Sequence, residues 1–91
     1  MYAKQTTVIN ETGLHARPAS EFVAEAKKFA SKITIQNLSK EGAAPANAKS
    51  MIRLLAEGLA KGTQVEIAAN GEDEVAAVDA LVALIDSGFG E

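Results

Sequence analysis

The sequence contains no cysteine. Without thiols the chain forms no disulfide and offers no thiolate ligand to a metal ion, so its stability must come from an apolar core. A reducing compartment suits such a chain, and we expect a cytoplasmic protein. We expect neither a metal nor a cofactor.

Long apolar runs are also missing. No stretch approaches the roughly 18 or more apolar residues of a membrane-spanning helix. Met1–Ile9 lacks the basic start and the continuous apolar stretch of a signal peptide. We therefore expect no membrane insertion.

Aromatic residues and positive charge are scarce. The chain has one tyrosine, three phenylalanines and no tryptophan, and its formal net charge is −3. Lysines and arginines stand singly, apart from the pair Lys27 and Lys28, which is typical of the solvated face of a helix. These features argue against a nucleic-acid-binding protein, which would need a basic stripe or a stacking platform.

The residues that are present have an ordinary globular balance, with 47% hydrophobic and 23% charged. Ninety-one residues suffice for one core and leave no room for a second domain. We expect a single domain over residues 1–91 that folds alone, as a monomer.

Alternation of polar and apolar residues predicts three strands, at Gln5–Ile9, Lys32–Leu38 and Thr63–Ala69. A fourth, near Ala44–Asn47, should be short and lie at an edge, because Pro45 cannot donate a ladder hydrogen bond.

Apolar residues at three- and four-residue steps predict a long helix from Ala16, with its apolar face continuing to Phe29 or Ala30. A short helix at Met51–Glu57 follows the N-cap Ser50. A last helix should begin at Glu72, with an acidic first turn, and stop at Gly88. Its buried stripe is expected to comprise Val75, Val78, Leu81, Val82 and Ile85.

Strands joined by helices are compatible with parallel crossovers, but four strands with only two long helices favour one antiparallel sheet. The predicted fold is α+β: an open-faced sandwich in which a four-stranded antiparallel sheet carries two long helices and one short helix on one face.

One cluster carries chemistry, Gly13-Leu14-His15-Ala16-Arg17-Pro18-Ala19, which places the only histidine where a turn meets a helix. Free N–H groups and the positive dipole end of a helix favour a phosphate dianion and a neutral, nucleophilic imidazole. Arg17 offers a forked, permanently charged donor for phosphoryl oxygens. The alternative is a histidine that merely caps the helix beside a surface arginine, and spacing alone leaves both interpretations open.

The cluster resembles the active-site signature of HPr, the histidine-containing phosphocarrier family of the bacterial sugar phosphotransferase system. The resemblance runs nearly end to end. It extends to Asn47-Ala48-Lys49-Ser50, to Gly58-Leu59-Ala60-Lys61-Gly62 and to Asn70-Gly71-Glu72-Asp73-Glu74.

The resemblance implies that His15 is phosphorylated on Nδ1 by enzyme I and passes the phosphoryl group to a sugar-specific enzyme IIA, with Arg17 assisting both transfers. It implies regulatory phosphorylation of Ser50 by an HPr kinase/phosphorylase, whereas the alternative role of Ser50 is plain capping. In the family, the face that corresponds to Met51, Ile52 and Leu55 docks partners, although the same residues would otherwise be ordinary core.

Two other classes of function compete with a phosphocarrier. A purely regulatory interaction module could dispense with His15 and Arg17, so their presence favours the carrier. A hydrolytic enzyme lacks support, because no second histidine, cysteine or evident carboxylate pair near the motif supplies a general base or metal site.

Overall fold

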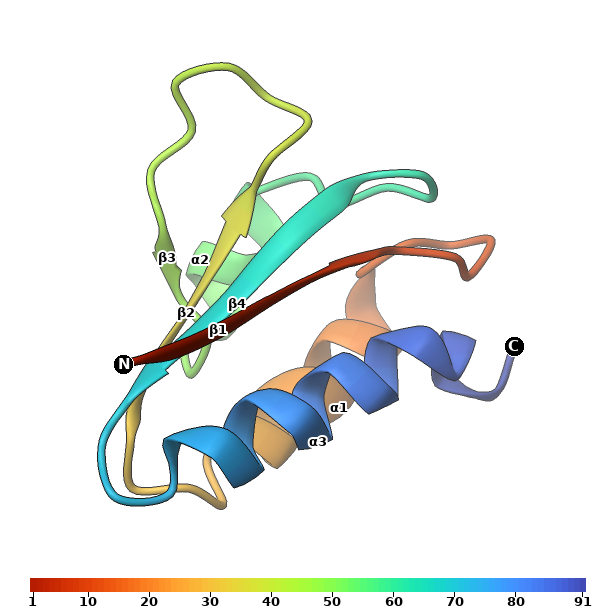
Figure 1. The fold of residues 1–91 in the computed structure, drawn as a ribbon. Coiled ribbons are helices and arrows are strands. Elements are labelled where there is room, and N and C mark those ends of the chain that lie inside the picture. Colours follow the sequence, from red (N-terminus) through yellow and green to blue (C-terminus); the bar gives the residue numbers. More distant parts are fainter.

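The strands form one antiparallel sheet in the computed structural model, which describes all of residues 1–91. They are β1 (Tyr2–Thr7), β2 (Lys32–Asn37), β3 (Ala46–Asn47) and β4 (Gln64–Asn70). Their order across the sheet is β1-β4-β2-β3, and every neighbouring pair is antiparallel. Strand β4 therefore lies in the interior of the sheet, between β1 and β2 (Figure 1).

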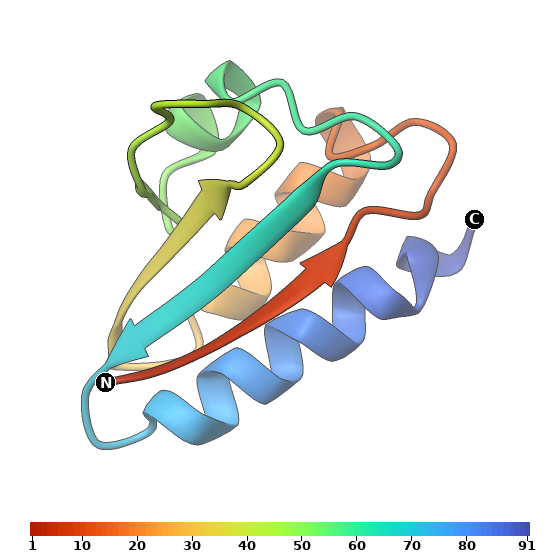
Figure 2. The same ribbon diagram turned by 45° about the horizontal axis from the view of Figure 1, so that its top comes forward.

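Three helices cover one face of this sheet. They are α1 (Ala16–Ala26), α2 (Met51–Ala56) and α3 (Glu74–Asp86), and a short 3₁₀ turn, η1 (Gly88–Gly90), follows α3. Helices α1 and α3 run side by side, as both views show (Figures 1 and 2). This arrangement confirms the predicted α+β open-faced sandwich.

The core lies between the sheet and the helices. Val65, Ile67 and Ala69 of β4 are buried, while the residues between them are only half-buried on the open face. Ile33 and Ile35 of β2 point to the same core. The alternation that predicted these strands thus identifies their buried face.

The first strand begins earlier than the alternation predicts. The sequence pattern placed it at Gln5–Ile9, but pairing with β4 runs from Tyr2 to Thr7. Because β1 is an edge strand without a fully buried side chain, its sequence carries little period-2 signal. Ile9 is half-exposed and lies beyond the strand.

The acidic run predicts that the last helix begins at Glu72, but in the structure it begins at Glu74. The Asp73 carboxylate instead accepts hydrogen bonds from the Ala30 and Ser31 N–H groups and from the Ser31 hydroxyl. These contacts tie the start of α3 to the turn before β2. Glu74 is therefore the one acidic residue inside the first turn, and Glu72 lies outside the helix.

The predicted buried stripe of α3 was wrong at Val75, whose residue is 50% exposed, and Val82 is only partly buried. Ala77 is fully buried instead, because the helix approaches β1 and β4 closely. Val78, Leu81 and Ile85 are buried as predicted.

Several other element ends differ by one or a few residues, among them those of α1 and β2. Helix α1 ends at Ala26, with Phe29 still packed against the core, while Ala30 is exposed and outside the helix. Strand β2 ends at Asn37, because the Asn37 side chain accepts the Ser39 N–H and begins the loop to β3.

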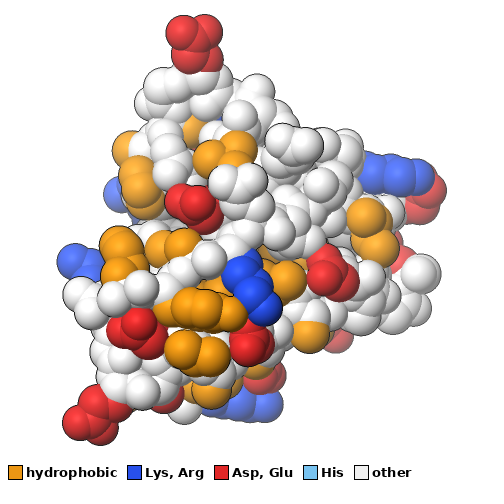
Figure 3. Space-filling view, in the orientation of Figure 1, with side chains coloured by type: hydrophobic (Ala, Val, Ile, Leu, Met, Phe, Trp, Pro, Cys, Tyr) orange, Lys and Arg blue, Asp and Glu red, His pale blue; other side chains and the backbone are white.

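Charged side chains of both signs are scattered over the face of the molecule shown in Figure 3. No helix in the structure combines the length and the apolar character that crossing a bilayer requires.

Candidate functional site

Gly13 closes the turn that leads into α1. Its φ is +65°, and a Cβ there would lie 2.4 Å from the Leu59 carbonyl oxygen, so only glycine fits. The Leu14 N–H donates to the same carbonyl at 2.8 Å. The turn before His15 is thereby joined to the segment after α2.

Asn10 holds the same turn from inside. Its side chain is buried, and Nδ2 donates to the Gly13 carbonyl at 2.6 Å and to Thr12 Oγ1 at 3.3 Å. The Gly13 N–H returns a hydrogen bond to the Asn10 carbonyl at 3.0 Å. Hydrogen bonds to Asn10 and to the Leu59 carbonyl therefore hold the turn through which the chain enters α1.

His15 occupies the N-cap position of α1, but its side chain does not cap the helix. The residue is exposed, and its imidazole makes no hydrogen bond within the chain. The N–H groups of Ala16 and Arg17 also lack partners, as expected for the first turn of a helix, and Pro18 has no N–H to leave unpaired. The structure thus contradicts the capping interpretation of His15 and places a free imidazole beside two free donors.

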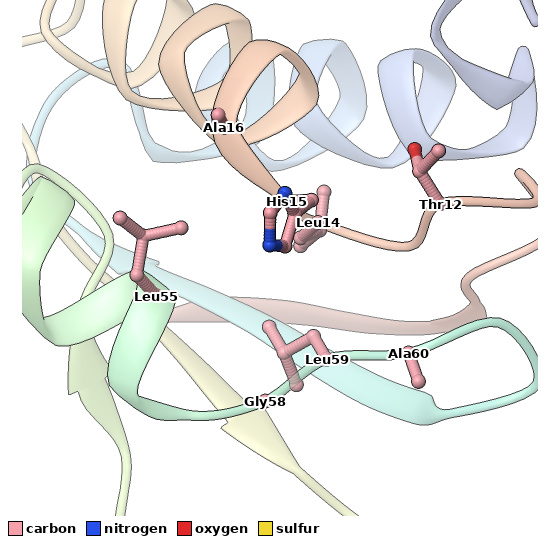
Figure 4. Close-up of a pocket in the computed structure, with 8 residues that line it drawn as sticks. All are labelled: Thr12, Leu14, His15, Ala16, Leu55, Gly58, Leu59 and Ala60. Carbon is pink, nitrogen blue, oxygen red and sulfur yellow. The ribbon is translucent and has the colours of Figure 1, made fainter.

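The imidazole borders a depression of about 390 Å³ between the start of α1 and the segment that follows α2. Figure 4 shows Leu55, Leu59 and His15 around this hollow, which Leu14 also lines. Most of its lining is hydrophobic. An apolar hollow bordered by a free imidazole makes this face of the molecule the candidate functional site.

The Arg17 guanidinium is paired with groups of the chain itself. Its Nη1 pairs with Glu21 at 3.0 Å, one helical turn on, and its Nη2 pairs with Glu91 at 3.1 Å. Nη1 also donates to the Phe89 carbonyl at 3.3 Å. The Arg17 side chain remains 55% exposed, so these pairs are exchangeable with solvent and with an incoming anion.

Sequence reasoning missed Glu91, whose carboxylate accepts hydrogen bonds from Thr12 in addition to the Arg17 pair. The hydrogen bond from the Thr12 hydroxyl is the main cause that lowers the pKa of Glu91, with smaller contributions from the Thr12 N–H, Arg17 and Asn10. No sequence pattern pointed to Glu91, because it lies 79 positions from Thr12.

Ser50 caps α2 as predicted, since its hydroxyl accepts the Arg53 N–H at 3.3 Å. On the same helix Leu54 is fully buried, whereas Ile52 is 80% and Leu55 43% exposed. Met51 is half-buried and borders a groove against α1. Of the three expected docking residues, only Leu55 lines the hollow beside His15.

No group of three or more histidine, aspartate or glutamate side chains lies close enough to hold a metal ion.

Comparison with known proteins identifies the family to which this architecture belongs. Residues 2–87 match the family model described as the PTS HPr component phosphorylation site. The phosphocarrier protein HPr of Haemophilus influenzae is 48% identical over 85 residues, which cover 93% of this chain and 95% of that protein. A crystal structure of HPr from Thermoanaerobacter tengcongensis superposes with a TM-score of 0.91 at 43% identity, covering 100% of this chain and 98% of the other.

A longer relative shows the same unit in another setting. The multiphosphoryl transfer protein of Haemophilus influenzae is 45% identical over 85 residues, which cover 93% of this chain but only 17% of that protein.

Fold, site and relatives together define a carrier of phosphoryl groups, which passes such a group on and catalyses no reaction alone. The chain belongs to the HPr family, the phosphocarriers of the sugar phosphotransferase system.

Proposed function

We propose that His15 is the residue that carries the phosphoryl group, and that all of residues 1–91 act as one phosphocarrier domain in the cytoplasm. The observation that supports this role most strongly is the free, exposed imidazole at a helix start with two unpaired N–H groups. The only histidine of the chain is therefore at a helix start, where free N–H groups can stabilise a dianion.

The transfer needs no external acid or base. The donor protein carries the phosphoryl group on an imidazole nitrogen. The unprotonated nitrogen of His15, Nδ1 in this proposal, attacks the phosphorus as the bond from phosphorus to that donor nitrogen breaks. The donor imidazole leaves with that electron pair, and each ring keeps the proton on its other nitrogen. Arg17 stabilises the phosphoryl oxygens once it leaves one of its internal partners.

The donor is enzyme I and the acceptor is a sugar-specific enzyme IIA. They dock on the apolar surface formed by Met51, Ile52 and Leu55, which continues toward the hollow beside His15. Lys27 borders the groove next to Met51 and has no acidic partner within the chain, which favours an acidic rim on the docking protein.

Ser50 is the regulatory site in this proposal, phosphorylated by an HPr kinase/phosphorylase. Its hydroxyl lies immediately before Met51 and Ile52, so a phosphate there adds charge at the edge of the docking surface. We also propose that the protein acts as a monomer.

Label transfer from phosphoenolpyruvate through enzyme I tests the assignment of His15. The variant His15→Ala should accept no acid-labile label, while a Thr34→Ala control on the open face of the sheet should accept it normally. Unchanged melting of His15→Ala would show that the fold is retained. Normal labelling of His15→Ala would reject His15 as the acceptor.

A further inference from the structure

A depression of about 310 Å³ at the β3 edge of the sheet gathers positive charge and contains no negative charge. It shares no residue with the depressions that border His15. Its positive charge contrasts with the formal net charge of −3 of the whole chain. The depression is lined by residues of β2, β3, α2 and the loop before β3, namely Lys32, Ile33, Thr34, Pro45, Asn47 and Arg53.

The sheet register brings its polar side chains together. Thr34 of β2 lies opposite Asn47 of β3 in the antiparallel pairing, so the two side chains share one face of the sheet. Lys32 precedes Thr34 by two residues on β2, which places it on that face as well. Helix α2 contacts β3 (Figure 1), and Arg53 lines the depression from this helix. Side chains from three elements therefore meet at this edge.

Both cations of the depression lack partners within the chain. The other lysines and arginines mostly pair with carboxylates or, for Lys49, donate to a carbonyl. The basic side chains that make no hydrogen bond or ion pair are those of Lys27, Lys32, Lys40 and Arg53. Two unpaired cations thus line one depression that no carboxylate borders, and an anion is the ligand that would neutralise them.

Neutral donors indicate which kind of anion fits. Asn47 Oδ1 accepts the Lys49 N–H at 2.9 Å, so the Nδ2 end of this amide remains available as a donor. The Thr34 hydroxyl also makes no hydrogen bond within the chain. A guanidinium fork matches two oxygens of one anion, and the ammonium, amide and hydroxyl supply further donors. This number of donors suits the three terminal oxygens of a phosphate group better than the two of a carboxylate.

We propose that this depression binds a small phosphate dianion, either free phosphate or the phosphomonoester group of a metabolite. Arg53 and Lys32 hold the phosphate oxygens, and Thr34 and Asn47 donate hydrogen bonds to them. Its volume lies near the lower end of the roughly 300–1,000 Å³ of ligand pockets, which limits the ligand to a few atoms beyond the phosphate. The site is separate from phosphoryl transfer at His15 and does not rest on it.

An NMR titration with inorganic phosphate, at an ionic strength held constant with sodium chloride, tests the site. The amide signals of Thr34 and Asn47 should shift and saturate. Lys32→Gln and Arg53→Gln should each weaken binding about 3- to 10-fold, because each removes a charge-assisted contact at an exposed site. The charge reversal Lys32→Glu should abolish it.

Lys40→Gln is the matched control. Lys40 is exposed and unpaired like Lys32, but it lies in the loop between β2 and β3 and does not line the depression. The control removes the same charge from the chain and should bind phosphate as the unmodified chain does. Because the substituted side chains are exposed, the spectra away from the depression should stay unchanged, which verifies that the variants are folded.

Two further ligands define the chemistry. Tighter binding of glycerol 3-phosphate than of inorganic phosphate would assign the site to an organic phosphomonoester, whereas equal or weaker binding would assign it to free phosphate. Acetate should bind at least about 5-fold more weakly than phosphate, because it has fewer oxygens and less charge. Acetate binding as tight as that of phosphate would overturn the assignment to phosphate.

Equal phosphate affinities for Lys32→Gln, Arg53→Gln and Lys40→Gln would overturn the proposal. Shifts at Thr34 and Asn47 that fail to saturate would also overturn it, as would binding confined to the start of α1. His15→Ala should keep the full affinity of this depression for phosphate. Failure of His15 to accept label would therefore reject the proposed function and leave the phosphate titration to decide this site.

Discussion

At the scale of single residues, the site depends on which polar groups are left without partners. The His15 imidazole has none, whereas Arg17 is shared among Glu21, Glu91 and a carbonyl. In the proposed transfer the imidazole is thus available at once, whereas the guanidinium becomes available only when an incoming anion replaces one of its partners. Replacing Glu21 costs little, because its pair with Arg17 lies between exposed side chains and such pairs contribute about 0–1 kcal/mol.

We expect Arg17→Ala to slow phosphoryl transfer about 10- to 100-fold, because the oxygens lose charge-assisted hydrogen bonds. Arg17→Lys should recover only part of the rate, since lysine keeps the charge and loses the fork. Rapid-quench kinetics with phosphorylated enzyme I measure both variants. Label should remain on His15 in each, and identical rates for all three proteins would show that the guanidinium has no role.

A second residue-scale prediction concerns Gly13. Gly13→Ala combines an unfavourable positive φ with a Cβ that would lie 2.4 Å from the Leu59 carbonyl oxygen, so we expect a loss of at least about 2 kcal/mol in unfolding free energy. Urea denaturation measures this loss. Gly42→Ala is the matched control, because its φ is also positive but nothing lies within 4 Å of its Cβ position. A similar loss in both variants would attribute the effect to φ alone.

At the scale of elements, α2 combines a capped start with an exposed apolar face. A negative charge at Ser50 favours the helix through its dipole, yet it must be desolvated when a partner covers Met51 and Ile52. Phosphorylation of Ser50 should therefore obstruct docking and leave α2 folded.

Ser50→Asp should keep its thermal midpoint and accept the phosphoryl group from enzyme I more slowly, chiefly through a raised KM. Ser50→Ala supplies the contrast, because it removes the bond to the Arg53 N–H and should cost about 0.5–2 kcal/mol of stability without impairing docking. Melting curves and initial rates of phosphorylation distinguish the two variants. Normal binding of Ser50→Asp to enzyme I would show that Ser50 acts only as the N-cap of α2.

At the scale of the whole molecule, acidic side chains join segments that are distant in sequence. Hydrogen bonds from the Ser31 hydroxyl and the Ala30 N–H lower the pKa of Asp73, and Lys4 lowers that of Asp79. The N–H of Gly71 lowers the pKa of Glu74, and so does the N-terminal ammonium of Met1, which pairs with Glu74 at 3.2 Å. All three carboxylates belong to the start and middle of α3 and tie it to the sheet or to the turn before β2.

A carboxylate whose pKa is depressed in the folded state adds stability above its unfolded pKa of about 4, and this stability is lost as pH falls through the folded value. We therefore expect the unfolding free energy to decrease below about pH 4. Asp73→Asn should flatten that decrease and lower stability at pH 7, whereas Glu72→Gln should do neither. Urea titrations between pH 7 and pH 2.5 provide the comparison, and the same acid dependence in Asp73→Asn would exclude Asp73 as a contributor.

The sequence by itself determined the features that depend on neighbours along the chain. Alternation identified the buried faces of β2 and β4, and the turn before His15 marked the start of α1. Ser50 was recognisable as a cap because a cap needs only an N–H three residues on. The likeness of the motif around His15 to a phosphocarrier signature also lay within one short segment.

Only the tertiary structure decided which of several apolar or acidic residues met a distant partner. Val75 and Ala77 look equally suited to the core, and the close approach of α3 to the sheet buries the smaller one. Likewise Asp73 binds the turn before β2, and Glu91 reaches Thr12 and Arg17 across most of the chain. Such contacts leave no periodic trace in the sequence, because their geometry exists only after the helices have packed on the sheet.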